Sequence, residues 1–330
     1  VKSLLQAGFD VTSERDSTRA ISIESYSGAQ VAGTGDWRSA PKEAIIIGLK
    51  ELPEEITPLH HRHIMFGHAF KDQPDGQKLL ERFQAGGGTL YDLEYLTDDT
   101  GRRVAAFGYW AGYAGAAVAI KSWAAAQKGN ICQPLQTFAS AKDLNADVAS
   151  DLGKKNPSVI IIGANGRVGS GAQDFCAALG ASVTCWDIEE TAHGGPFPEI
   201  LDHDIFLNCI LANKNTPVFV PKKAKIGPRK LMVIGDIACD PGSFYSPIKV
   251  YDCATSWEKP ALRVHKDKIL DITAIDNLPS LLPRESSEDF AAQLLPHLMM
   301  LKEIEKGVWG KACAIFNEYI SRTNAAKSQS

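Results

Sequence analysis

Two apolar runs in the first third of the chain each end in a side chain that can move protons. Lys50 follows residues 44–49, and His68 closes residues 63–68; both runs have the composition of buried β-strands. An amine and an imidazole are common general acids and bases near neutral pH. Ligands of α/β sheets bind at the carboxyl ends of the strands. The pair is therefore a candidate acid–base site, and a structural role for each residue stays open.

Charged residues close by in sequence extend this candidate site. A lysine acts as a base only after losing its proton, which burial favours and a neighbouring carboxylate opposes. Glu51 and Glu94 are the carboxylates expected to set that balance. Arg102 and Arg103 are permanent cations suited to substrate carboxylates, with a solvated surface pair as the alternative.

A glycine-rich turn follows the β-branched residues 159–162 and leads into a helical pattern over 172–179. Its glycines, Gly163, Gly166 and Gly169, have the spacing G-x-x-G-x-x-G, a variant of the dinucleotide fingerprint. Glycines allow a tight turn and a close approach of the backbone to a pyrophosphate, whose charge meets the N–H groups of the helix N-terminus. The pattern predicts a dinucleotide site; a glycine turn without a ligand is the alternative.

The strand predicted at 182–186 ends in Asp187. An acidic side chain at this place in a dinucleotide fold accepts hydrogen bonds from the adenosine ribose. A carboxylate there repels a 2′-phosphate, so we expect NAD rather than NADP. A simple turn role for Asp187 is the competing interpretation.

Histidines and cysteines form no recognisable metal motif, and no metal is expected. His60, His61 and His63 lack the spacing of a zinc site, and we interpret them as surface or capping residues. The 7 cysteines include no C-x-x-C pair. We expect reduced thiols, mostly buried, with one fortuitous disulfide as the alternative.

Strand and helix patterns alternate along most of the chain, which is typical of an α/β fold with parallel sheets. The expected strands cover 44–49, 63–68, 89–96, 159–162, 182–186, 205–210 and 231–234. The expected helices cover 1–5, 77–83, 107–127, 172–179, 286–301 and 308–324. Small residues within 107–127 would let another backbone approach closely, and this helix could bridge two domains.

Length and composition favour a two-domain globular protein with a small-molecule substrate. The 330 residues exceed one typical domain of roughly 100–200. A formal net charge of −4 offers no broad basic surface, so we expect no nucleic-acid partner. The longest uncharged run, 104–120, is shorter than the roughly 20 residues that a bilayer span needs, so we expect a buried helix and no membrane anchor.

Six longer blocks of sequence are distinctive enough to identify a family. They are Gly48-Leu49-Lys50-Glu51-Leu52-Pro53-Glu54, Phe66-Gly67-His68-Ala69-Phe70-Lys71-Asp72-Gln73, Gly88-Thr89-Leu90-Tyr91-Asp92-Leu93-Glu94, Gly101-Arg102-Arg103-Val104-Ala105-Ala106-Phe107-Gly108, Gly194-Gly195-Pro196-Phe197 and Asp276-Asn277-Leu278-Pro279-Ser280-Leu281-Leu282-Pro283-Arg284-Glu285. In these blocks, and over nearly its whole length, the chain resembles the fungal saccharopine dehydrogenases of the NAD-dependent, L-lysine-forming type. The wider group includes alanine dehydrogenase and transhydrogenase.

The resemblance implies an α/β protein of two Rossmann-like domains with a cleft between them. A substrate domain would combine residues 1–105 with 285–330, a linking helix would cover 106–130, and 131–284 would form the NAD-binding domain. The implied reaction is reversible: saccharopine, NAD and water give L-lysine, 2-oxoglutarate and NADH. It is the last step of the aminoadipate route of lysine biosynthesis.

The resemblance also implies roles for single residues. Lys50 matches the base for the substrate's secondary amine, and His68 matches the acid–base group for water addition and carbinolamine collapse. Glu51 and Glu94 match carboxylates near that lysine. The implied substrate contacts are Lys71, Gln73, Arg102, Arg103 and Phe107. The implied cofactor contacts are Gly163, Gly166, Arg167, Gly169, Asp187, Thr191, Ile237, Ala238, Cys239, Asp240, Asp276 and Leu278.

The sequence also departs from the family pattern. Family members carry a strand with an Arg-x-x-x-Thr-Pro motif before the helix at which this sequence starts, and Val168, Leu211 and Asn277 stand where the family has a cysteine, a tyrosine and a histidine. Two alternatives therefore stay open: a paralogue acting on another imine or secondary amine, and a non-catalytic NAD-binding homologue. We expect a monomer in the cytoplasm rather than the peroxisome, because the C-terminus lacks an S-K-L tripeptide.

Overall fold

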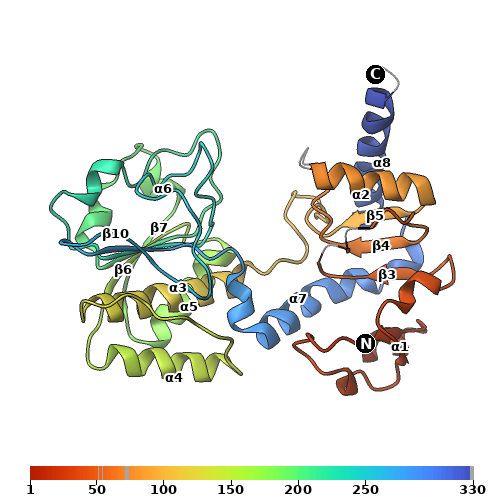
Figure 1. Ribbon diagram of the computed structural model, residues 1–330, viewed down its shortest axis with the longest axis horizontal. Helices are drawn as coiled ribbons and strands as arrows, with labels where there is room; N and C mark the ends of the chain where they lie inside the picture. Colours follow the sequence, from red (N-terminus) through yellow and green to blue (C-terminus); the bar gives the residue numbers. More distant parts are fainter. Residues whose placement is uncertain (51, 54, 71–73, 328–330) are drawn as a thin grey trace. The chain divides into compact units, whose positions relative to one another are not determined.

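The computed structural model describes residues 1–50, 52–53, 55–70 and 74–327 (Figure 1). The chain divides into two compact units, which are considered separately below. Unit 1 combines Val1–Ala106 with Asp289–Ser330, and unit 2 is Phe107–Glu288. Each unit contains a parallel sheet flanked by helices, so the predicted α/β class is confirmed.

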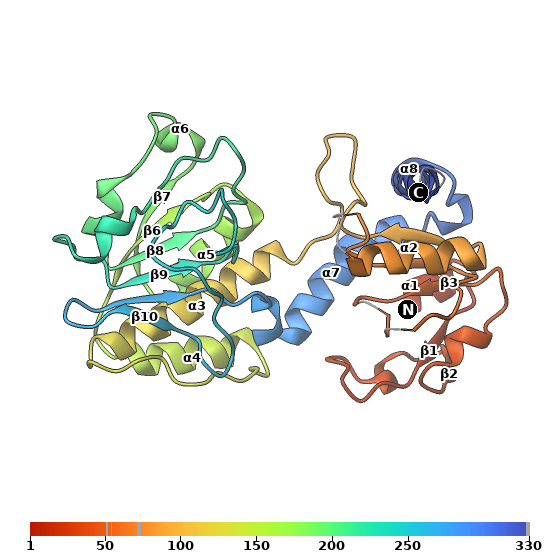
Figure 2. The same cartoon turned by 45° about the horizontal axis from the view of Figure 1, so that its top comes forward.

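Unit 1 is built on a short parallel sheet with the strand order β3-β4-β5. Two further strands, β1 and β2, form a separate parallel pair (Figure 2). The elements of unit 1 are α1 (Lys2–Gln6), β1 (Thr12–Glu14), η1 (Ile23–Ser25), β2 (Gln30–Ala32), η2 (Asp36–Ser39), β3 (Ile45–Ile47), β4 (Arg62–Met65), α2 (Pro74–Gly86), β5 (Thr89–Asp92), η6 (Leu301–Glu303) and α8 (Gly307–Lys327). In its core, Met65 and Leu90 of the sheet pack with Phe83 of α2 and Phe316 of α8.

Unit 2 is a larger sheet with the order β10-β11-β9-β8-β6-β7, parallel except for the edge pair β10–β11. Its elements are α3 (Gly108–Ala126), α4 (Ala141–Leu152), β6 (Ser158–Ile162), α5 (Arg167–Ala178), β7 (Ser182–Trp186), α6 (Ile188–Thr191), η3 (Pro198–Asp202), β8 (Ile205–Asn208), η4 (Lys222–Lys225), β9 (Val233–Asp236), β10 (Leu262–His265), β11 (Leu270–Thr273) and η5 (Leu278–Leu281). The remaining helix, α7 (Pro283–Leu298), begins in unit 2 and ends in unit 1.

The two faces of the unit 2 sheet are covered differently. Alternate residues of β6 point to opposite faces: Val159 and Ile161 pack in the cluster of α3, α4 and α5, whereas Ile160 and Ile162 pack in a second cluster. Figure 1 shows the three helices along one side of the sheet. The strands β7 and β8 lie on either side of β6, so the strand order reverses there, and such a switch point is where nucleotides bind.

Helix α3 lies against α5 at unusually short distance. A Cβ added to Gly112 would lie 1.8 Å from the carbonyl oxygen of Val168, and one added to Gly171 would lie 1.9 Å from that of Tyr109. Only glycine permits this crossing, which confirms that small residues in this helix serve a close backbone approach. The helix expected to link two domains is thus part of the core of unit 2.

Four strands end earlier than the sequence predicts; β3 and β8 do so by two residues, and β4 and β5 by more. The strand expected to reach His68 ends at Met65, and the one expected to reach Leu96 ends at Asp92. The reason lies in the Asp92 carboxylate, which accepts the backbone N–H of Gly67 (3.3 Å) and of Glu94 (2.9 Å). These amides leave the ladder because a side chain satisfies them instead.

The interpretation as a surface or capping residue is wrong for His63. His61 is buried rather than on the surface, but it is a capping residue, since its Nε2 hydrogen-bonds the carbonyl of Ala40, the C-cap residue of η2, at 3.0 Å. His61 is 5% exposed and His63 is 1% exposed. β4 is the central strand of its sheet, and central parallel strands are buried on both faces. The His63 ring packs edge-on against Trp37 and Phe83. His60 fits the interpretation, since it is exposed and its Nδ1 hydrogen-bonds the carbonyl of Gly86 at the end of α2.

Acid is expected to destabilise unit 1 through His63. Burial lowers the pKa of His63 from 6.5 to about 4. The unfolded chain takes up this proton near pH 6.5 and the folded chain only near pH 4, so stability is lost as the pH falls through that window, by roughly 3 kcal/mol. We expect His63→Phe to flatten the fall in the urea midpoint between pH 7 and pH 4.5. The control variant His60→Asn, at an exposed histidine, should show the same fall in the urea midpoint as wild type. If His63→Phe also showed the wild-type fall, burial of His63 would not be the cause of the acid sensitivity.

The cysteines are free, as expected, but they are less uniformly buried than predicted. Cys132, Cys176 and Cys209 are buried, Cys239 and Cys313 are half-buried, and Cys185 and Cys253 are exposed. The prediction of buried packing is therefore wrong for the last two. Within the described ranges, no cluster of three or more metal-ligating side chains is present, and no helix is both long and apolar enough to cross a bilayer.

Candidate active site

The carboxyl edge of the unit 1 sheet brings together three of the predicted site residues. Lys50, His68 and Glu94 follow the last residues of β3, β4 and β5, which are adjacent parallel strands. The backbone N–H of Phe66 donates to the carbonyl of Leu49 at 3.3 Å, so the segments after β3 and β4 stay joined beyond the strands. Lys50 is exposed, as a residue that meets a substrate must be.

His68 is held in an uncommon conformation beside a carboxylate. Its φ of 48° lies in the left-handed region, which costs a non-glycine residue about 1 kcal/mol or more. Its Nδ1 lies 3.6 Å from Oε2 of Glu94, and its ring stacks on Phe66 with the centroids 6.4 Å apart. The His68 side chain is 41% exposed and that of Glu94 23% exposed, but the Oε2 atom of Glu94 that faces His68 is buried.

Asp92 supports this edge and is a residue that the sequence analysis missed. It is 0% exposed, and its carboxylate joins the backbone before His68 to the backbone of Glu94 through the two hydrogen bonds described above. Burial raises the pKa of Asp92, and the two backbone N–H groups act against that rise. A signal was present in the sequence, because a carboxylate closes an otherwise apolar strand and precedes the site residue Glu94 by two positions.

The remaining predicted substrate contacts are only partly described. Arg102 and Arg103 are exposed in a loop closed by the Thr97–Arg103 bridge, in which Asp98 Oδ1 accepts the N–H of Arg102 at 3.0 Å. Phe107 is the residue directly before α3 and belongs to unit 2. Glu51, Lys71 and Gln73 lie outside the described residues.

The glycine loop of unit 2 has the shape of a pyrophosphate cradle. Gly163 has a φ of 89°, and a Cβ on Gly169 would lie 2.2 Å from the carbonyl oxygen of Gly163, so the fold itself requires both glycines. Gly166 differs: its φ is −79°, and the nearest atom to an added Cβ is 3.5 Å away. No described side chain caps α5, which starts at Arg167. The backbone N–H groups and the free space at Gly166 therefore fit a phosphate of a dinucleotide.

Asp187 stands next to this loop at the end of β7. Its Oδ2 accepts the N–H of Asn165 at 2.8 Å, and its Oδ1 accepts that of Ile188 at 2.9 Å. It also forms a capping box with Glu190, while the hydroxyl of Thr191 donates to the Asp187 carbonyl at 2.8 Å. The carboxylate is thereby fixed within the loop region and half-exposed, as a ribose acceptor must be.

Two further segments predicted to contact the cofactor lie at the same carboxyl edge. Residues 237–240 follow β9, and residues 275–278 follow β11, its neighbour in the sheet. The Cys239 thiol donates to the carbonyl of Ala274 at 3.1 Å, which ties the two segments together. Asp240 and Asp276 are exposed, whereas Leu278 is 4% exposed, so any contact from Leu278 would come from its backbone.

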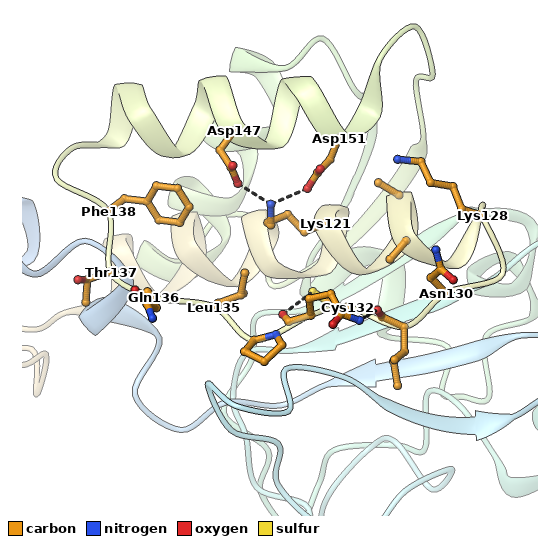
Figure 3. Close-up of a pocket in the computed structure, with 15 residues that line it drawn as sticks. Lys121, Lys128, Asn130, Cys132, Leu135, Gln136, Thr137, Phe138, Asp147 and Asp151 are labelled. Atoms are coloured by element: carbon orange, nitrogen blue, oxygen red, sulfur yellow. Dashed lines mark hydrogen bonds and ion pairs between the residues drawn. The ribbon is translucent and has the colours of Figure 1, made fainter.

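A separate hollow of about 700 Å³ in unit 2 lies between α3, α4 and the segment 130–138 (Figure 3). Lys121 reaches between Asp147 and Asp151 of α4 and pairs with both. Burial acts to lower the pKa of Lys121, but the hydrogen bonds to the two carboxylates outweigh it and raise the pKa. The two carboxylates thus compensate the charge of Lys121, and none of the predicted site residues that the structure describes lines this hollow.

Comparison with known proteins defines the class first. Residues 1–114 match the family described as alanine dehydrogenase/PNT, N-terminal domain. A solved structure named L-alanine dehydrogenase aligns with a TM-score of 0.64 over 92% of this chain and 84% of its own, at 18% sequence identity, which shows a shared fold. The chain therefore has an alanine dehydrogenase-like fold, with a glycine-rich loop after β6 of unit 2.

Curated relatives then define the family. Proteins named saccharopine dehydrogenase [NAD(+), L-lysine-forming] from Candida albicans and Schizosaccharomyces pombe are 43% and 41% identical over 97% of this chain, and cover 92% and 93% of their own lengths. Alpha-aminoadipic semialdehyde synthase of Bos taurus is 23% identical, and the match covers 41% of its length. The chain belongs to the NAD(+)-dependent, L-lysine-forming saccharopine dehydrogenase family. The predicted family, enzyme class and NAD cofactor are confirmed by this membership.

Proposed function

We propose that this chain catalyses the reversible, NAD-dependent cleavage of saccharopine to L-lysine and 2-oxoglutarate, as the last step of a lysine-forming route. The observation that carries the proposal is the carboxyl edge of the unit 1 sheet, where Lys50, His68 and Glu94 follow three adjacent parallel strands. The family's reaction needs one proton acceptor for an amine and one for water, and the two basic side chains at this edge supply both.

In this proposal Lys50 accepts the proton of the substrate's secondary amine, which frees its lone pair to assist loss of hydride from the adjacent carbon. Bound NAD would supply the acceptor for that hydride. His68 then takes a proton from the water that attacks the resulting iminium carbon, and returns it to the nitrogen of the carbinolamine. His68 next takes the hydroxyl proton as the C–N bond breaks, which gives the carbonyl group of 2-oxoglutarate and free lysine. The carboxylate of Glu94, 3.6 Å from Nδ1 of His68, orients the imidazole.

We assign the binding of the substrate to unit 1 and the binding of the cofactor to unit 2. We assign the substrate carboxylates to Arg102 and Arg103 on the exposed loop of unit 1, together with Lys71 and Gln73. We assign the cofactor to unit 2, with its pyrophosphate at Gly166 and Arg167 and its adenosine ribose at Asp187. The free space at Gly166 and the fixed Asp187 carboxylate support this assignment.

The reverse reaction gives a test that separates this proposal from its rivals. Incubation with L-lysine, 2-oxoglutarate and NADH should consume NADH only when both organic substrates are present, seen as a fall in absorbance. Matched incubations replace lysine with ornithine and 2-oxoglutarate with pyruvate. Faster NADH loss with a replacement substrate would establish a paralogue of different specificity. NADH binding without turnover of any pair would establish a non-catalytic homologue.

A further inference from the structure

A buried group of three hydrogen-bonded side chains lies at the carboxyl ends of β8 and β9. Asp236, the last residue of β9, is 2% exposed. Its Oδ1 accepts from Nδ2 of Asn208 at 2.9 Å, and its Oδ2 accepts from the hydroxyl of Tyr251 at 2.5 Å. Asn208 ends β8 and pairs in register with Ile162 of β6, directly before the glycine loop. The group therefore lies at the switch point of the sheet.

The same residues hold the backbone that leaves β9. The N–H of Ile237 donates to the carbonyl of Asn208 at 3.1 Å, and the N–H of Cys239 donates to that of Asp236 at 3.3 Å. Cys239 has a φ of 49°, a left-handed conformation that a non-glycine residue keeps only where its surroundings enforce it. The loop 237–240 is thus held in an uncommon shape by residues at its own base.

Packing alone does not account for a carboxylate at this place. Burial raises the pKa of Asp236, and placing an acidic group in an apolar interior is costly unless hydrogen bonds satisfy it. A leucine of similar volume would fill the space without that cost. Unlike leucine, the carboxylate forms directional hydrogen bonds. These bonds join the ends of β8 and β9 to Tyr251, which lies in a segment further along the chain.

We propose that Asp236, held by Asn208 and Tyr251, is a positioning residue that fixes the loop 237–240 and, through it, the nicotinamide half of NAD. The inference rests on the proposed function. A dinucleotide crosses the switch point of such a sheet, and Asp187 at β7 takes the adenosine side. The other half then lies over the ends of β8, β9 and β11, where this loop starts.

Removing one hydroxyl group tests the proposal with a matched control. Tyr251→Phe deletes the hydrogen bond to Asp236, and Tyr113→Phe deletes a similar bond, 2.9 Å long, to Asn145 elsewhere in unit 2; both tyrosines are 7% exposed. We expect the Kd for NADH, measured by fluorescence on the apoprotein, to rise about tenfold in Tyr251→Phe and to stay unchanged in Tyr113→Phe, with similar falls in Tm. Equal Kd values in both variants would overturn the proposal.

Two variants of Asp236 test whether its hydrogen bonds, rather than its volume, support NADH binding. The Oδ1 atom of Asn208 is buried and has no hydrogen-bond partner among the described residues. In Asp236→Asn, the new amide can donate to that oxygen once the Asn208 amide turns over, and its carbonyl can still accept from Tyr251. We expect Asp236→Asn to bind NADH within about twofold of wild type and Asp236→Leu to lose about tenfold. Wild-type binding in a folded Asp236→Leu would also overturn the proposal.

These measurements do not depend on the substrate assignment. NADH binding is measured without saccharopine or lysine. A wild-type protein that binds NADH and turns over no saccharopine would contradict the proposed function, while the Tyr251 and Asp236 comparisons would still decide the role of this group.

Discussion

Replacing Lys50 with Met is expected to lower kcat for saccharopine oxidation roughly 10²–10⁴-fold, the usual contribution of a general base. His68→Gln should have an effect of similar size, because glutamine keeps the polarity and approximate length of the side chain but cannot take up and return a proton. The KM for NAD should change little in either variant, since we assign the cofactor to unit 2. Steady-state kinetics with saccharopine and NAD measure both constants.

Each of these substitutions has a control in the same unit. Lys42 is an exposed lysine just before β3, whereas Lys50 follows that strand, so Lys42→Met removes an equal charge from the opposite strand end. His60→Gln removes an exposed imidazole that hydrogen-bonds the end of α2. Both controls should keep wild-type kcat. Full turnover in folded Lys50→Met and His68→Gln would remove the basis for the acid–base assignment.

Adding one methyl group at Gly166 is expected to raise the Kd for NADH roughly 10- to 100-fold, a loss of about 1.4–2.8 kcal/mol. The nearest described atom to the added Cβ is 3.5 Å away and the φ of −79° suits any residue, so Gly166→Ala should fold with a Tm close to wild type. The added methyl group would occupy space that we assign to the pyrophosphate of the cofactor. Calorimetry with NADH and a thermal melt of the same sample separate binding from stability.

Gly169→Ala is the contrasting variant in the same loop. Its Cβ would lie 2.2 Å from the carbonyl oxygen of Gly163, so the loop and α5 must move apart. We expect a lower Tm as well as weaker binding. If Gly166→Ala bound NADH as tightly as wild type, the glycine loop would have only the structural role that its sequence also allowed.

The fold could be predicted where the signal is local. The strand β6, the glycine loop and α5 are contiguous in sequence, and the structure contains them in the expected order. The ends of β4 and β5 could not be predicted, because they depend on the Asp92 side chain capturing backbone amides from two segments. The burial of His61 and His63 depends on the place of β4 in the middle of the sheet, which a single strand pattern does not reveal.

Parts of the candidate site could also be predicted from the sequence, and other parts could not. That Lys50 and His68 share one edge could be predicted, since parallel strands present their carboxyl ends together. Glu94 is expected inside the strand 89–96, and its position after β5 depends on the early end of that strand at Asp92. The group of Asp236, Asn208 and Tyr251 could not, because Tyr251 reaches β9 through an irregular segment held by the bridge between Val220 and Ile248. No periodic pattern in the sequence marks that contact.

The most direct test of the central claim is the stoichiometry of the forward reaction. Purified protein is incubated with saccharopine and NAD, and NADH, L-lysine and 2-oxoglutarate are quantified in the same sample by absorbance and mass spectrometry. We predict equal amounts of the three products, with none formed by the Lys50→Met, His68→Gln double variant within the same time. NADH formed without lysine, or no NADH from saccharopine under conditions in which NAD binds, would contradict the account.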